Sequence, residues 1–522
     1  MEHLKTEVLI IGSGFGAAPP ALRLSEAGYK VLMIEKGLNV VPHKDFKMTQ
    51  DPKYILKYIT SMENKNISFT YAEALGGGSG FYEMVSLRAP SKVFNQMDET
   101  GKYYWPSGIN RRVLDTYYDI TENMMNVKQI SKEDIPVSGL VFSQMMRNLG
   151  YSCDRARYAV KGCVGSGYCI TGCVFGAKQS LHFNYLPQAK AAGMKIIANL
   201  EALSIRPLFS NLNSTRNNKS LSSIPYRYVV KCKDLSKNEL VNIDTKLIIL
   251  GGGTIGTAKL LLNSRHYLHF LSNQIGKNIA FNGSVKAIGL LPEESINVDM
   301  FTGRSHPGMI SYHFLESRGI TISSAKPLPL YFVSSARFKL EGEKSSPSYW
   351  GLPNVDLMKK YRRRMIVLYA LGLTPPVAEL HSNKSGKITP KLNLDSETKN
   401  YYSSTKNLLY HILRKNNCKV VYHTMVNSEG QPKNDIFFST THMVGSCRMA
   451  DNIKNGVVDA HGEVFNYPGI YITDGATIPT SLAVNSSLTI TANAERIAEH
   501  IVNRFTMVQN KKKIKSYNLS DN

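Results

Sequence analysis

The sequence predicts an α/β protein in which one discontinuous domain is covered by a second, α+β domain. Three segments support this, because each reads as an apolar strand followed by a turn and a helical stretch. They start at residues 6, 246 and 469, near the beginning, the middle and the end of the chain. Such units build α/β domains, and the chain between them can fold as a cap. The expected domains are 1–90, 155–285 and 440–510 for the first, 91–154 and 286–439 for the second, built on an antiparallel sheet, and 511–522 for a basic tail.

The net charge is strongly positive, yet it does not indicate nucleic-acid binding. The 63 Lys and Arg outnumber the 40 Asp and Glu, an excess that can serve nucleic acids or anionic membranes. The cations gather in short clusters, at 359–364 and 511–513, without zinc-finger spacing or an arginine-rich helix. We therefore predict a solvated basic surface and no nucleic-acid partner. Peripheral contact with an anionic membrane stays open as an alternative.

The chain shows no signal for export or for membrane spanning. Its first strand begins by about residue 7, which leaves no room for a signal peptide. The longest apolar run, 365–378, is interrupted by Pro375 and Pro376. Seven cysteines in a chain of 522 residues do not form the disulfide framework of a small secreted domain. We expect a cytoplasmic protein.

A dinucleotide-binding turn is predicted directly after the first strand. Gly12, Gly14 and Gly16 lie in a stretch of the G-x-G-x-x-G type, which permits a tight turn and lets the backbone approach a pyrophosphate. Amides at the start of the following helix would face the anion. Glu35 ends the next strand, 19 residues after Gly16, where its carboxylate can accept hydrogen bonds from ribose hydroxyls. The motif alone does not distinguish FAD from NAD.

Two prolines complicate the helix after this turn. Pro19 and Pro20 fall in its first turns, and proline inside a helix removes a hydrogen-bond donor and clashes with the preceding turn. Either the regular helix begins near Pro20 or its first turn is distorted.

Four further segments occur in an order that resembles the glucose–methanol–choline (GMC) oxidoreductases, near their sterol-oxidase branch. They are a glycine-rich loop at 75–80, an aromatic stretch at 104–118, a turn and helix at 253–263, and a block at 442–485. The last block is the most specific, because several motifs recur there at family-like spacing. The resemblance implies a Rossmann-like FAD-binding domain, a substrate (cap) domain and the oxidation of an alcohol.

The resemblance also implies where the flavin end of FAD would bind. Gly77, Gly78 and Ser79 belong to the loop whose backbone must lie against the flat isoalloxazine ring. Asp474 and Gly475 end the third strand, where the carboxylate can accept from ribityl hydroxyls and the following amides can meet phosphate. Because 75–90 contains no histidine or cysteine, we expect FAD to be bound non-covalently.

His442 and Asn485 are the predicted catalytic residues. His442 opens an H-x-x-G-[ST]-C-x-M pattern that carries the catalytic histidine in the family it resembles, and histidine titrates near neutrality, as an acid–base group must. Asn485 stands where relatives place His or Asn, and its amide can orient the substrate oxygen. Ser486 follows in place of the usual proline, which leaves the local turn uncertain.

A cysteine cluster offers an alternative site. Cys163, Cys169 and Cys173, with Ser166 in register, imitate an iron–sulfur ligand run, but one ligand is missing. We predict structural thiols and no metal.

The substrate is less defined than the reaction. Apolar stretches at 328–333 and 366–373 favour a bulky apolar alcohol, and either oxygen or a quinone-like acceptor could reoxidise the flavin. Two alternatives remain: non-redox or light-driven chemistry on the same fold, and a catalytically idle flavin-binding scaffold. An NAD-dependent dehydrogenase does not explain the Asp474 segment.

Overall fold

The computed structural model describes residues 2–49, 51–64, 66–209, 221, 224–299, 303–326, 336–343, 351–382, 387–425 and 438–505. The predicted basic tail at 511–522 and the apolar stretch at 328–333 lie outside these residues. Among the helices that the structure describes, none is long and apolar enough to cross a membrane.

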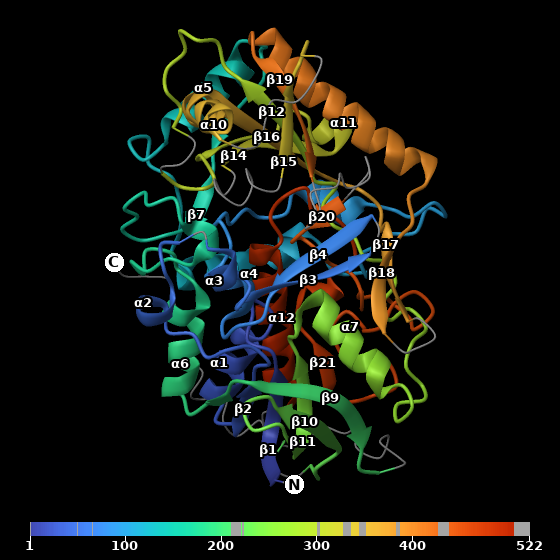
Figure 1. The fold of residues 1–522 in the computed structure, drawn as a ribbon. Coiled ribbons are helices and arrows are strands. Elements are labelled where there is room, and N and C mark those ends of the chain that lie inside the picture. The colour runs from blue at the N-terminus through green and yellow to red at the C-terminus, as the bar shows by residue number, and fades with distance from the viewer. Residues whose placement is uncertain are drawn as a thin grey trace, which may run out of the picture.

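The first sheet is a mixed sheet of seven strands in the lower half of Figure 1. Its order is β8-β2-β1-β11-β10-β9, and β21 pairs with β11. The strands β8, β2, β1, β11 and β21 are parallel, whereas β10 and β9 are antiparallel to their neighbours. The three strand–turn–helix segments predicted from the sequence therefore meet in one sheet. The strands are β1 (Glu2–Ile11), β2 (Val31–Ile34), β8 (Lys195–Ile197), β9 (Leu200–Pro207), β10 (Tyr228–Asp234), β11 (Glu239–Leu250) and β21 (Ile470–Ile472).

The core lies between this sheet and its helices. The last four residues of β1 and of β11 are all buried, as expected for central strands covered on both faces. α1 (Ala18–Glu26) packs against α6 (Tyr185–Ala191) and α12 (Ser487–Phe505), and α12 also packs against α4 (Arg111–Met124). α7 (Gly253–Ser264) packs on β9.

The two prolines lie in the first turn of α1. The helix begins at Ala18, so Pro19 and Pro20 occupy positions whose N–H groups would have no acceptor within the helix. The Ala21 amide donates to the Ala17 carbonyl at 3.1 Å, which starts the regular pattern directly after them. The prolines therefore neither delay the helix nor distort it.

The second sheet is antiparallel throughout its described strands and forms the upper half of Figure 1. Its order is β15-β19-β12-β16-β14-β13-β6. The strands are β6 (Asp154–Arg155), β12 (Val285–Leu290), β13 (Met309–Ser311), β14 (Ile320–Ala325), β15 (Ala336–Leu340), β16 (Met365–Gly372) and β19 (Lys419–Met425). The helices α5 (Val137–Arg147), α10 (Leu352–Arg364) and α11 (Ser396–Lys415) accompany it.

The two faces of this sheet have different environments. Along β16, Ile366, Leu368 and Ala370 join an apolar core with α5 and α11, whereas Val367 and Tyr369 line a cavity on the other face. The apolar character of 366–373 therefore comes largely from core packing. This stretch is therefore weaker support for an apolar substrate than its sequence suggested.

A small third sheet lies between the other two (Figure 1). The hairpin of β3 (Ile59–Asn64) and β4 (Ile67–Ala72) is extended by β20 (Phe438–Thr440), which pairs parallel to β4. β20 thus brings the chain that follows it beside the hairpin. The remaining elements are α2 (Pro42–Asp45), α3 (Pro52–Ile55), β5 (Val127–Gln129), β7 (Arg157–Ala159), α8 (Leu315–Arg318), β17 (Ala378–Ser382), β18 (Ile388–Leu392) and the short 3₁₀ turns η1 (Gly77–Gly80), η2 (Ser91–Asn95), η3 (Cys169–Thr171), η4 (Leu181–Phe183) and η7 (Gly475–Thr477).

Candidate active site

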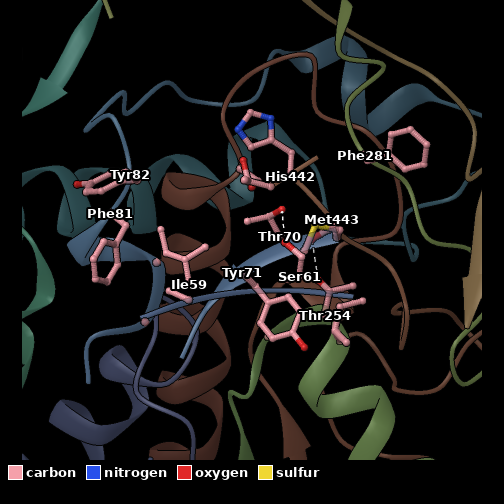
Figure 2. A pocket seen from close by; sticks show the side chains of 18 of the residues that line it. Ile59, Ser61, Thr70, Tyr71, Phe81, Tyr82, Thr254, Phe281, His442 and Met443 are labelled. Atoms are coloured by element: carbon pink, nitrogen blue, oxygen red, sulfur yellow. Dashed lines mark hydrogen bonds between the residues drawn. The ribbon is translucent and has the colours of Figure 1, made fainter. Parts of the chain in front are cut away.

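One large cavity of about 1790 Å³ connects the two main sheets. Its wall includes the turns that follow β1, β11 and β21, the β3–β4 hairpin, and the inner face of β12 and β16. Figure 2 shows His442, Tyr82 and Phe81 around it together with the hairpin residues Ile59 and Thr70. Pockets for drug-sized ligands measure roughly 300–1,000 Å³. This cavity is large enough for a long cofactor and a second molecule beside it.

The turn after β1 requires glycine for packing as well as for ligand access. A Cβ on Gly12 would lie 2.3 Å from the Gly251 carbonyl oxygen, and one on Gly16 would lie 2.3 Å from the Asp474 Cα. Gly14 differs, because a Cβ there would meet only the Gly77 Cα, at 3.9 Å. All three glycines line the cavity. Gly12 and Gly16 therefore join the three turns closely, and Gly14 leaves bare backbone facing the ligand space.

Glu35 is a buried carboxylate at one end of this cavity. Its side chain is 7% exposed; Oε2 accepts from the Ser13 hydroxyl at 2.6 Å, and Oε1 accepts from the Gly37 amide at 2.8 Å. Burial raises the pKa of Glu35, and these hydrogen bonds oppose that shift. A carboxylate has about four acceptor positions. Glu35 can therefore accept further hydrogen bonds from hydroxyls in the cavity.

Ser13 is a site residue that sequence reasoning missed. Its hydroxyl donates to Glu35 and accepts from the Gly76 amide at 2.9 Å. It therefore ties the first turn to the glycine-rich loop. Its position between two motif glycines was the available signal.

Asp474 joins β21 to the start of α7. Oδ2 accepts from the Gly253 amide at 2.7 Å and from the Thr257 hydroxyl at 2.5 Å, and Oδ1 accepts from the Ala476 amide at 2.8 Å. Burial raises the pKa of Asp474 to about 6, against the effect of these donors. Three of about four acceptor positions are thus used within the protein. Asp474 and Gly475 both line the cavity, so one position remains for a ligand.

The glycine-rich loop faces the cavity with backbone, while its serine turns inward. Gly77 and Gly78 line the cavity, and a Cβ on Gly78 would meet nothing within 4 Å. Ser79 is fully buried and is absent from the cavity wall. Its hydroxyl donates to the Gly76 carbonyl at 2.6 Å and accepts from the Leu181 amide at 3.2 Å. The side chain of Ser79 therefore holds the turn and does not reach the cavity.

His442 and Asn485, distant in sequence, meet at the cavity. The Asn485 Nδ2 lies 3.4 Å from the His442 Nε2, and the Tyr369 hydroxyl lies 3.4 Å from the other ring nitrogen, Nδ1. An amide nitrogen only donates, so Nε2 is the acceptor and Nδ1–H donates to Tyr369. Burial, with the charge of Lys286, lowers the pKa of His442 to about 4. The imidazole is therefore neutral at physiological pH and can accept a proton.

The segment before Asn485 is clamped by the second sheet and its entry loop. The buried Asn282 accepts from the Leu482 amide at 2.6 Å and donates to the Val484 carbonyl at 2.7 Å. Thr321 of β14 donates to the carbonyl of Ala483, whose φ of 55° is left-handed. These bonds hold the backbone of residues 482–484, the turn whose conformation could not be predicted from the sequence. They fix Asn485 just before α12.

Sequence reasoning missed three polar side chains of the cavity beneath the second sheet. Tyr369, Lys286 and Glu83 all line it. Lys286 is the charged residue in the otherwise apolar strand β12, and Tyr369 interrupts the apolar strand β16. A single polar residue in such a strand is the signal that could have indicated them.

The cysteine cluster lies apart from this cavity. Cys163, Cys169 and Cys173 line a separate pocket of about 20 Å³ with Lys178 and Arg304. All seven cysteines are free thiols. Within the described part of the chain, no group of three or more His, Cys, Asp or Glu is arranged to hold a metal ion.

The residues of the large cavity fit a flavin dinucleotide. Bare glycine backbone faces the cavity at Gly14 and Gly78, and Glu35 and Asp474 keep acceptor positions unused. Backbone without side chains suits a pyrophosphate and a flat ring system, and the carboxylates suit sugar and ribityl hydroxyls.

Comparison with known proteins finds similar sequences along most of the chain. The GMC oxidoreductase profile for the N-terminal region matches residues 6–281, and the one for the C-terminal region matches 386–494. A cholesterol oxidase of Acinetobacter baumannii is 24% identical over 96% of this chain and 95% of its own. A cholesterol oxidase of Mycobacterium tuberculosis is 24% identical, with 94% and 90% covered. The long-chain-alcohol oxidase FAO3 of Arabidopsis thaliana is 22% identical over 97% of this chain and 69% of its own.

Proposed function

The chain belongs to the GMC oxidoreductase family, and on that premise we propose that it oxidises an alcohol to a carbonyl compound with FAD as cofactor. The observation that carries this proposal is the contact of His442 with Asn485 in the cavity that Glu35 and Asp474 also line. The proton acceptor His442 Nε2 and the amide donor Asn485 Nδ2 lie next to each other there. An alcohol hydroxyl bound between them would meet both.

The cofactor would be held without a covalent bond. The turn at Gly12–Gly16 would receive the pyrophosphate, Glu35 the ribose, and the loop at Gly77 and Gly78 the isoalloxazine ring. When bound, FAD supplies the hydride acceptor, N5 of its ring. No histidine or cysteine stands at 75–90 to attach it.

His442 would take the hydroxyl proton. Its Nε2 carries the lone pair, because Nδ1–H is directed at Tyr369, whose hydroxyl is 3.1 Å from that of Ser284. This arrangement fixes the tautomer and the ring orientation, as acid–base catalysis requires. Asn485 would donate from Nδ2 to the substrate oxygen, which places the C–H bond and stabilises the developing alkoxide.

The proposed substrate is a bulky, largely apolar alcohol, and the proposed electron acceptor is oxygen. The relatives named above are cholesterol and long-chain-alcohol oxidases. In this chain, Phe281, Ile288 and Val367 give apolar wall to the cavity that His442 also lines. These side chains would pack against an apolar substrate body.

Anaerobic titration of the yellow holoprotein with a panel of alcohols tests this function. We expect the flavin absorbance to bleach with at least one sterol or long-chain alcohol and to return on admission of air. If the flavin absorbance returned only after addition of a quinone, the electron acceptor would be quinone-like and not oxygen. No bleaching with any alcohol, or turnover that depends on light or leaves the flavin oxidised under anaerobic conditions, would contradict the proposal.

A further inference from the structure

A lysine projects from the second sheet into the cavity. In β12, Ala287 packs in an apolar core, whereas Lys286 lines the cavity. Lys286 is the exposed residue of this strand, yet the surrounding protein lowers its pKa by burial. The exposure of the side chain and the effect of burial on its pKa are consistent if its exposed surface faces the interior of the cavity. The ammonium group of Lys286 therefore stands inside the ligand space.

This ammonium group has no carboxylate at contact distance. Among the residues that the structure describes, no Asp or Glu oxygen lies within 4.0 Å of Lys286 Nζ. Its close neighbour is the ring of Tyr369, whose centroid lies 5.4 Å away. An ammonium carries three donors, and a charge away from bulk water is stable only when it is paired or solvated. The site is therefore short of an anion.

The other charged groups near Lys286 do not supply an anion in contact with its ammonium group. Glu83 also lines the cavity, but its oxygens lie beyond 4.0 Å from Lys286 Nζ; burial raises the pKa of Glu83, and the charges of Lys286 and Lys178 oppose that shift. Two ammonium groups, those of Lys286 and Lys178, thus act on the one carboxyl group of Glu83.

Tyr369 connects this ammonium to the reacting position. Lys286 and Tyr369 are paired across β12 and β16, so their side chains leave the sheet together. The ammonium lies over the tyrosine ring, and the hydroxyl of the same ring is 3.4 Å from the His442 imidazole. A molecule with its hydroxyl at His442 and Asn485 can therefore extend along Tyr369 to Lys286.

We propose that Lys286 binds a carboxylate of the substrate, so that the preferred alcohol is a hydroxy acid with an aliphatic body. This inference rests on the proposed function and narrows its substrate class. The carboxylate supplies the missing anion as a charge-assisted acceptor. Ile288 and Val367, the next cross-strand pair on the inner face, add apolar wall beside Lys286. Neutral alcohols of the same length lack the anionic contact and bind less tightly.

The test compares 12-hydroxydodecanoic acid with 1-dodecanol in the holoenzyme at pH 8, where His442 is neutral. Apparent Kd values come from the substrate dependence of anaerobic flavin reduction. The binding of dodecanoic acid, which has no hydroxyl to oxidise, is measured by calorimetry. We expect the hydroxy acid to bind about 10- to 100-fold more tightly than dodecanol, the range of a hydrogen bond to a charged group.

Variants locate the effect. Lys286→Met should abolish the preference and the calorimetric signal, and Lys286→Arg should keep both within a few-fold. Lys406→Met is the matched control, because Lys406 also lines the cavity and lies over a tyrosine ring, that of Tyr410, at 5.8 Å. It should retain the preference.

Three results would overturn the inference. They are equal binding of acid and alcohol by the wild type, an unchanged preference in Lys286→Met, and a Lys286→Met defect confined to reoxidation by oxygen. The first result is measured on the wild type alone, so the inference can be refuted even if the variants fail to fold. Dodecanol oxidation without any preference for the acid would refute the inference alone. Loss of dodecanoate binding in Lys286→Met, in a protein whose flavin no alcohol reduces, would instead refute the proposed function and keep the anion site.

Discussion

Replacing Gly16 by alanine should destabilise the protein before any ligand binds. The added Cβ would lie 2.3 Å from the Asp474 Cα and 2.6 Å from the Thr473 carbonyl oxygen. Both are backbone atoms, so no side chain can rotate away. Overpacking in a close-packed interior costs typically about 1–3 kcal/mol, and backbone contacts place Gly16→Ala at the upper end. The clash also moves Asp474, which orders the start of α7 through Gly253.

Gly14→Ala is the matched control. Its Cβ would be 3.9 Å from the Gly77 Cα, an ordinary contact, and it would point toward the cavity. This substitution should leave the flavin-free protein as stable as the wild type and weaken FAD binding alone, by roughly tenfold or more where one added methyl must be accommodated.

Thermal unfolding of the flavin-free proteins and FAD titration separate the two effects. About 3 kcal/mol should lower the Tm of Gly16→Ala by about 3 °C in a chain of this length, whereas Gly14→Ala should melt within about 1 °C of the wild type. Equal melting of flavin-free Gly16→Ala and wild type would refute the close joining of these turns. Equal FAD affinity of Gly14→Ala and wild type would refute the placement of the cofactor.

Three further outcomes follow from the site. The rate of alcohol-dependent flavin reduction should stay constant from pH 8 to about 5 and fall below that with a midpoint near pH 4. The reason is that the base must be neutral and the pKa of His442 is lowered to about 4. A midpoint near pH 6.5 in stopped-flow measurements would contradict this. Asp474→Asn should weaken FAD binding and cost about 1–3 kcal/mol of stability, since an amide nitrogen cannot accept from Gly253 and Thr257; unchanged Tm and FAD affinity would show that these bonds matter little. Acid precipitation should release intact FAD into the supernatant, and flavin retained in the pellet would disprove non-covalent binding.

The sequence indicated those site residues whose role depends on local backbone geometry. Gly12, Gly16 and Glu35 follow a strand–turn–helix–strand pattern, and Asp474 ends a similar strand far along the chain. Each signal is local, and the parallel sheet brings them together because β1, β11 and β21 pair. His442 was predicted from its motif, and the structure places it beside Asn485.

The remaining residues depend on tertiary placement. Lys286 and Tyr369 reach the cavity only because β12 and β16 pair in a register that puts both on the inner face. Glu83 follows the glycine-rich loop without a motif of its own. Ser79 shows the opposite limit, because it was predicted from its place in the glycine-rich loop but its side chain turns into the protein. Local pattern does not state which way a side chain leaves a tight turn.

The proposed mechanism requires above all that His442 and Asn485 act on one substrate hydroxyl. Stopped-flow flavin reduction at saturating alcohol, in His442→Ala, Asn485→Ala and the double variant, measures this directly. Loss of His442 should lower the rate about 10²–10⁴-fold, and loss of Asn485 on the order of 10²-fold. The double variant should lose markedly less than the product of the two, because both residues serve one transition state. All three proteins should retain FAD. Flavin reduction at the wild-type rate in His442→Ala would contradict the mechanism.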